Sequence, residues 1–166
     1  MIFLDQAHLQ KFDSKTTPLV GNYFFNELNK SLEGARLSVL SIQYQWKWNI
    51  HDRHSKIHQL GETITRLCQR GIEVKVILNQ ESPGRNLTKI NRVSGNKLAD
   101  LGCQTKLLYT GALVHAKVWI IDGRFTFIGS HNISSRALTA NEEVSVKIES
   151  TEFARIMKEY FFRLWS

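Results

Sequence analysis

The sequence predicts an α/β fold in which helices cover both faces of a mixed β-sheet. Strand-like apolar segments are interleaved along the chain with segments whose apolar residues recur every three or four positions, as in helices. The Asp122-Gly123 pair between two β-branched and aromatic segments predicts an antiparallel hairpin, which makes the sheet mixed. We see no linker, repeat or low-complexity stretch, so we expect one domain over residues 1–166.

Each expected element follows from a local pattern of apolar residues. Alternating or continuous apolar residues predict strands at 35–45, 72–78, 104–109, 112–122, 125–128 and 143–149. Three- and four-residue spacing predicts helices at 18–32, 57–68, 89–101 and 151–164, the first three ending at glycines. Trp46 and Trp48 follow the first strand, and we favour a core position for them over base stacking or a dimer contact.

The predicted hairpin carries four polar side chains near its outer ends: His115, Lys117, Ser130 and Asn132. If Asp122 and Gly123 form a two-residue loop, Lys117 faces Ile128 and His115 faces Ser130. Side-chain alternation then places all four on one face of the ribbon. These residue types suit a phosphate ester, because a neutral imidazole can attack phosphorus while an ammonium and neutral donors hold the phosphoryl oxygens.

The spacing His-x-Lys-x4-Asp, followed by Gly-Ser-x-Asn at residues 129–132, resembles the signature of the phospholipase D superfamily and matches it at each of those positions. The resemblance implies a two-step reaction through a phosphohistidine on His115, with Lys117 as the phosphate clamp and no metal. It also implies a glutamate about a dozen residues further on, which matches Glu143.

Three other residues near the motif have less certain roles. Asp122 belongs to the signature, but its place in the turn favours a structural role over a reacting one. Glu143 is a candidate partner that orients the histidine ring, and Glu142 is the alternative. His131 lies between Ser130 and Asn132, so alternation points it to the other face, and we expect it to be structural.

Two histidine patterns are weaker candidates. His54 and Lys56 form a second His-x-Lys, but neither the aspartate nor Gly-Ser-x-Asn follows it. His51, His54 and His58 share one side of a helical pattern, yet no cysteine or carboxylate completes a zinc set. We therefore interpret them as polar residues beside an amphipathic helix and expect no metal.

Charge and composition point to polyanionic partners. The net charge is +7, and one segment, Ser82 to Leu98, concentrates basic residues without an acid: Arg85, Lys89, Arg92 and Lys97. We expect a mobile basic loop that leads into a short helix and contacts nucleic-acid phosphates; a solvated loop is the alternative. Cys68 and Cys103 are isolated and are expected to be reduced thiols of a cytoplasmic protein, although removal of a leader would permit an extracytoplasmic location.

One motif per chain predicts a homodimer. The leaving alkoxide needs a general acid, and a second His115 across a two-fold axis would supply it. The first expectation for function is a metal-independent endonuclease that cleaves DNA or RNA. A phospholipase or cardiolipin hydrolase of the same superfamily is the alternative, and a non-catalytic nucleic-acid-binding member is the third. A membrane association is not expected, because no apolar run approaches the roughly 20 residues of a membrane span.

Overall fold

A computed structural model describes residues 11–48, 54–82 and 84–166. Its strands are β1 Lys15–Val20, β2 Ser38–Gln43, β3 Glu73–Asn79, β4 Gln104–Leu108, β5 Lys117–Ile121, β6 Phe125–Gly129 and β7 Val144–Glu149. Its helices are α1 Tyr23–Glu33, α2 Lys56–Gln69, α3 Asn86–Asp100, α4 Ser135–Thr139 and α5 Thr151–Trp165.

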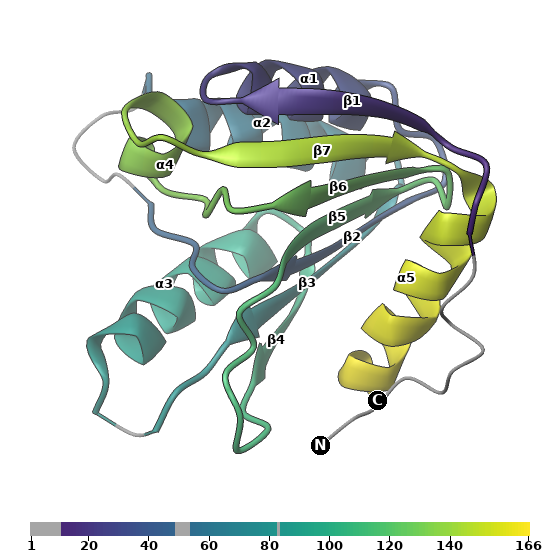
Figure 1. The fold of residues 1–166 in the computed structure, drawn as a ribbon. Coiled ribbons are helices and arrows are strands. Elements are labelled where there is room, and N and C mark those ends of the chain that lie inside the picture. Colours follow the sequence, from purple (N-terminus) through teal and green to yellow (C-terminus); the bar gives the residue numbers. More distant parts are fainter. Residues whose placement is uncertain (1–10, 49–53, 83) are drawn as a thin grey trace.

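The described strands form one seven-stranded sheet in the order β1-β7-β6-β5-β2-β3-β4 (Figure 1). β2, β3 and β4 pair in parallel, whereas the remaining pairs are antiparallel. β2 lies between β3 and β5, so it joins the parallel part to the antiparallel part. The predicted mixed sheet is therefore confirmed.

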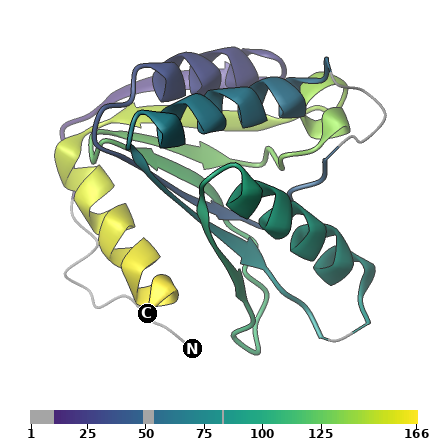
Figure 2. The ribbon, with the colours of Figure 1, turned by 180° about the vertical axis from the view of Figure 1, so that it is seen from behind.

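Helices cover both faces of the sheet, as predicted. α1, α2 and α3 lie against one face, and α5 lies against the other (Figures 1 and 2). Successive side chains of β5 point to opposite faces of the sheet. Trp119 and Ile121 pack in the core beneath α1, α2 and α3, and Val118 and Ile120 pack in the core beneath α5. β5 is buried throughout, so it forms a rigid support for the residues at its start.

Two predicted helix boundaries were wrong. The helix expected at 18–32 begins only at Tyr23, because residues 15–20 form the edge strand β1. An edge strand tolerates Pro18, whose missing N–H costs no ladder hydrogen bond on the open side. α3 begins at Asn86 rather than at 89, so residues 86–88 of the expected basic loop are the first turn of a regular helix.

The hairpin has a different register from the predicted one. Asp122 and Gly123 both adopt positive φ, 55° and 61°, as the turn signal requires. The loop nevertheless includes Arg124, so Ile121 faces Phe125 and Val118 faces Ile128. This one-residue shift places Lys117 level with Gly129, and it removes the shared hairpin face on which the sequence argument relied. In addition, β5 begins at Lys117, which leaves His115 in the preceding loop.

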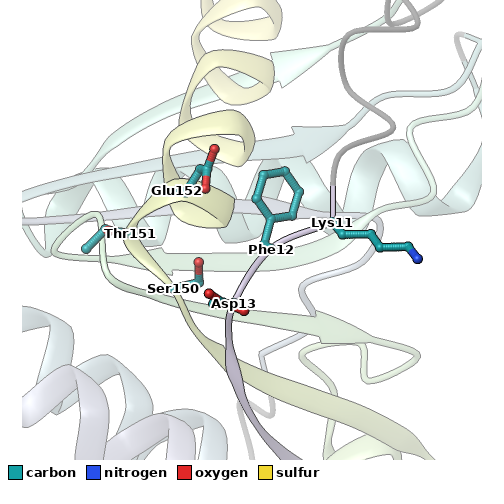
Figure 3. A pocket seen from close by; sticks show the side chains of 6 residues that line it. All are labelled: Lys11, Phe12, Asp13, Ser150, Thr151 and Glu152. Carbon is teal, nitrogen blue, oxygen red and sulfur yellow. The ribbon is translucent and has the colours of Figure 1, made fainter.

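The segment before β1 packs across the start of α5 (Figure 3). The Phe12 and Phe153 rings meet edge to face with their centroids 6.1 Å apart. Ser150 caps α5 by accepting the Phe153 N–H at 3.3 Å. A largely polar hollow of about 410 Å³ lies here, at the opposite end of β7 from Glu143. Within the described ranges, no helix is both long and apolar enough to span a membrane.

Candidate active site

The loop that carries His115 is fixed to the C-terminal ends of two neighbouring strands. Tyr44, directly after β2, donates its N–H to the Ala116 carbonyl at 3.0 Å. The buried Asn79, the last residue of β3, accepts the Val114 N–H at 2.9 Å through Oδ1. The backbone on either side of His115 is therefore held, although the residue itself reaches the surface.

His115, Lys117 and Tyr44 form one contact group. The Lys117 Nζ lies 3.1 Å from Nε2 and 3.2 Å from Nδ1 of His115, and it donates to the His115 carbonyl at 2.7 Å. The Tyr44 ring lies 4.5 Å from the imidazole, centroid to centroid, and the ammonium lies 4.9 Å from the Tyr44 centroid. Because an ammonium can only donate, the ring nitrogen that it faces must present a lone pair.

The surroundings of this group favour a neutral imidazole. Burial of the ring and then the Lys117 charge lower the pKa of His115 below its ordinary value. Burial also lowers the pKa of Lys117, which is only 8% exposed, while the Glu143 carboxylate opposes that shift. A neutral imidazole beside a partly desolvated ammonium is a nucleophile next to an anion-binding group.

Ser130 and Glu143 form a second group. The Ser130 hydroxyl donates to Glu143 Oε2 and accepts the Val144 N–H at 3.1 Å. The other carboxylate oxygen, Oε1, accepts from the Asn141 amide at 3.1 Å. The serine proton is thus directed to Glu143. Glu143 contacts this serine and not the His115 ring, and Glu142, the alternative partner, is exposed.

Asn132 contributes an amide with unused hydrogen-bonding capacity. Among the residues that the structure describes, its enclosed Oδ1 has no hydrogen-bond partner. An unpaired buried polar atom is costly, so it marks a place where a polar ligand would be favourable. The amide oxygen and nitrogen exchange places by rotation, and either can face such a ligand.

Asp122 lies at the other end of β5. It is five strand positions from Lys117, or roughly 17 Å. Its carboxylate accepts the backbone N–H groups of Arg36, Leu37 and Ser38 at 2.8 to 3.2 Å. The fold therefore separates Asp122, which we included among the catalytic candidates, from His115. Its contacts fix the start of β2 and agree with the structural role expected from its turn position.

The family was identified by comparison with known proteins. The family described as "Cardiolipin synthase, PLD-like domain" matches residues 28–165, which is most of the chain.

The chain belongs to the phospholipase D superfamily.

Individual relatives within this superfamily differ in their named activities. Mouse mitochondrial cardiolipin hydrolase is 31% identical over 107 residues, covering 64% of this chain and 46% of its own length. The 5'-3' exonuclease PLD3 of Xenopus laevis is 26% identical over 167 residues, covering 93% of this chain and 32% of its own length. The chain thus spans less than half the length of these curated relatives.

Solved structures support the phospholipase D fold. Nuc from Salmonella typhimurium, a phospholipase D family member, superimposes with a TM-score of 0.73 at 18% identity, covering 91% of this chain and 95% of Nuc. NucT from Helicobacter pylori gives 0.68 at 23% identity, with 92% and 96% covered. At identities of 18% and 23%, these superpositions are evidence for the fold alone.

His131 is a buried structural residue of this phospholipase D-like domain, as expected. It is 1% exposed and stacks on Phe24 with ring centroids 4.2 Å apart. The Gly21 carbonyl, 3.1 Å from Nε2, can only accept, so Nε2 carries the proton and Nδ1 accepts from the Ser145 hydroxyl at 2.7 Å. Burial lowers the pKa of His131, against the Gly21 hydrogen bond and the Glu143 charge.

The phospholipase D motif also depends on a glycine at position 129. β7 passes so close that a Cβ on residue 129 would lie 2.4 Å from the Ser145 Cα. Any larger residue would push β6 from β7 and separate Ser130 from the backbone of Val144, to which it is hydrogen-bonded. The glycine of Gly-Ser-x-Asn is therefore a packing requirement.

Three polar residues of this domain were missed by the sequence argument. Tyr44 contacts the motif directly, whereas Asn79 and Asn91 act through the backbone. Asn91, buried in α3, donates to the Tyr44 and Asn79 carbonyls at 2.8 Å and accepts the Trp46 N–H at 3.0 Å. The available signal was an asparagine on the apolar side of a helix, which is uncommon unless all its hydrogen bonds are made.

The basic candidates lie on and beside α3. Arg85, Lys89 and Arg92 are exposed, and their spacing places them on one side of the helix. Lys97 is half-buried, with its ammonium 5.4 Å from the centre of the Trp48 ring. The expected core position is confirmed for Trp46, which is fully buried, and Trp48 is half-buried.

Two of the three histidines considered as zinc ligands, His54 and His58, lie in the described part of the chain. Outside the undescribed positions, no group of three or more His, Cys, Asp or Glu is placed to hold a metal ion. His58 packs edge-on against Trp48, and His51 lies outside the described residues. Cys68 and Cys103 are free thiols, and burial raises the pKa of both.

Proposed function

We propose that this chain is a metal-independent phosphodiesterase that cleaves DNA or RNA internally, through a phosphohistidine on His115. The observation that carries the proposal is the exposed His115 ring with the Lys117 ammonium 3.1 Å from its Nε2. A nucleophile and an anion-binding group in contact are what phosphoryl transfer requires. Membership of the superfamily supports the same reaction class.

In the first step a ring nitrogen of His115 attacks phosphorus and forms an N–P bond while the P–O bond to the leaving alkoxide breaks. The Lys117 ammonium moves from the ring to the phosphoryl oxygens, where negative charge grows. Asn132 donates to the same oxygens through its amide NH2, once the amide has rotated to exchange its oxygen and nitrogen. Ser130 and Glu143 link the ends of β6 and β7, and the Glu143 charge favours the protonated form of Lys117.

The leaving alkoxide takes its proton from His115 of the partner subunit in a symmetric homodimer. In the second step a water oxygen attacks phosphorus, the partner's His115 takes its proton, and the N–P bond breaks. One composite site per dimer follows, because one imidazole cannot be nucleophile and general acid at once. The presence of a single motif in the chain supports this assembly.

The dimer is tested by subunit mixing. A fixed amount of wild-type protein is mixed with an equal amount of His115→Ala protein and allowed to exchange. With one composite site per dimer, activity falls to about half, because half of the wild-type subunits acquire an inactive partner. Sedimentation establishes the oligomeric state of both proteins. Undiminished activity after complete exchange, or a fully active monomer, would contradict the shared site.

Nucleic acid is the proposed substrate because Arg85, Lys89 and Arg92 line one side of α3 and the chain carries a net charge of +7. The named activity of PLD3 is consistent with this choice.

The test is a panel of single-stranded DNA, duplex DNA, RNA and phospholipid vesicles, each assayed in EDTA. We expect nucleic-acid cleavage that His115→Ala abolishes. Loss of cleavage in EDTA that a divalent ion restores would reject the metal-free mechanism.

Hydrolysis of a phosphatidyl ester, such as cardiolipin, is the second candidate. The family description and the 31% identical mitochondrial cardiolipin hydrolase favour it, and the same side chains would serve. Turnover of cardiolipin vesicles without cleavage of any nucleic acid in the panel would reverse our ranking. Binding of nucleic acid without turnover of any substrate would favour a non-catalytic role.

A further inference from the structure

A small apolar cleft with two lysines beside it lies between α3 and the segment that follows β2. Trp48, Ile90 and Val93 provide its apolar lining, and Lys47 and Lys89 are exposed at its edge. Its volume is about 250 Å³. Val93, in the middle of α3, is 55% exposed. The cleft therefore combines an exposed apolar floor with positive charge.

The cleft is rigid. The Trp48 indole packs so closely on α2 that a Cβ on residue 61 would lie 2.7 Å from Cη2 of the ring, and only glycine fits there. Trp46 lies 6.2 Å from Trp48, centroid to centroid, and the Lys97 ammonium lies over the same ring. The Asn91 amide ties α3 to the backbone of Trp46, so both walls are fixed relative to each other. A ligand would meet a preformed surface and would not have to order it.

The cleft lies close to the proposed nucleophile. Lys47 follows Tyr44 by only three residues, so their Cα atoms are at most about 11 Å apart. Tyr44 in turn contacts His115. At roughly 3.4 Å for each nucleotide along a stacked strand, about three nucleotides span the distance between the Tyr44 and Lys47 Cα atoms, so a strand bound at His115 would reach Lys47 within a few more.

We propose that this cleft binds one unpaired base of the substrate strand, with Lys47 and Lys89 on the flanking phosphates. The inference rests on the proposed nuclease function and specifies its substrate as single-stranded. The volume is below the roughly 300–1,000 Å³ of pockets that enclose a small molecule, so the cleft suits one flat ring of a longer polymer. Bases in a duplex are paired and stacked, and their faces cannot reach Trp48 and Val93.

Binding can be tested apart from cleavage, using the His115→Ala protein in EDTA. The probes are a ten-nucleotide oligothymidylate and an abasic ten-mer in which tetrahydrofuran replaces every nucleoside, so that the phosphates are the same. We expect the oligothymidylate to bind about 5- to 100-fold more tightly, the range expected for stacking of one base. A duplex of equal length should show no such gain over the abasic strand after correction for its extra phosphates by salt titration.

Val93→Glu should remove the difference between the two probes. Its side chain is exposed, so folding should be little affected, and Leu37→Glu is the matched control, with an exposed aliphatic residue at the opposite end of β2. The added charge weakens both probes alike, so the ratio between them isolates the base. Equal affinities for the two probes, or a ratio that Val93→Glu leaves intact, would overturn the proposal.

The remaining outcomes are also decisive. Cardiolipin vesicles that bind through Val93, with no base-dependent binding, would overturn the proposal in favour of a lipid. Cleavage of the oligonucleotide by the wild-type protein is scored separately. Base-dependent binding without cleavage would reject the nuclease function and support the base-binding role of the cleft. Cleavage without base-dependent binding would support the nuclease function and reject the base-binding role.

Discussion

Replacing Asp122 with asparagine should weaken folding and leave chemistry intact. Three backbone N–H groups, from Arg36, Leu37 and Ser38, converge on this carboxylate. A hydrogen bond to a buried charge contributes roughly 1.5–3 kcal/mol, but two of these donors are exposed and water can replace their partner. Asparagine keeps one acceptor oxygen and tolerates the positive φ.

We therefore expect Asp122→Asn to lower the free energy of unfolding by about 1–2 kcal/mol, or the Tm by about 3–6 °C in a domain of this size. Urea and thermal unfolding followed by circular dichroism measure this change. Asp100→Asn, at an exposed position near the end of α3, is the control and should stay within about 0.5 kcal/mol of wild type. Turnover of a phosphodiester well below the Tm should be unchanged. A normal Tm with turnover reduced 100-fold would place Asp122 in the chemistry and refute the reasoning.

Three further predictions concern groups near the site. Tyr44→Leu should lower kcat about 10-fold, because the ring contacts both His115 and Lys117, while Tyr44→Phe keeps the ring and should stay within about twofold of wild type. Equal losses in both variants would instead implicate the hydroxyl. Because the pKa of His115 is lowered, kcat/KM should rise with pH along an acid limb centred below about 6.5, the ordinary pKa of histidine. An acid limb centred above about 6.5 would contradict a neutral nucleophile. Because the pKa of His131 is lowered in the folded protein, the unfolded chain binds a proton on this ring more readily than the folded chain does. The free energy of unfolding should therefore fall as the pH drops from about 6.5 through the folded-state pKa. His131→Asn should show a shallower fall in urea titrations at pH 7.5 and 5.5, and an unchanged slope would refute the assignment.

Local sequence patterns determined most of the architecture. The period of apolar residues predicted the buried β2 and the amphipathic α2 and α5, and the Asp-Gly pair predicted a hairpin turn with positive φ at Asp122 and Gly123. These features depend on neighbours within a few residues, so the sequence records them directly. The proximity of His115 and Lys117 is of the same kind, because the two residues are only two apart.

The register of the hairpin depended on distant contacts. Asp122 binds the backbone of residues 36–38, which precede it by more than 80 positions, and its own N–H donates to the Ser38 carbonyl at 2.9 Å. With these contacts the hairpin has a three-residue loop, 122–124, whereas the Asp-Gly pair predicted a two-residue loop. In the same way, Pro18 favours neither a helix nor a strand by itself, and the open edge beside β7 allows it to lie in β1.

By itself, the sequence determined the family motif, the element types and the residues able to attack or bind a phosphate. The tertiary structure decided which distant residues touch: Lys117 with Tyr44, Glu143 with Ser130, and Asp122 with the start of β2. It also decided that Trp48 and Val93 share one cleft. The physical reason is that periodicity is a property of adjacent residues, whereas these contacts join segments brought together only when the sheet and its helices pack.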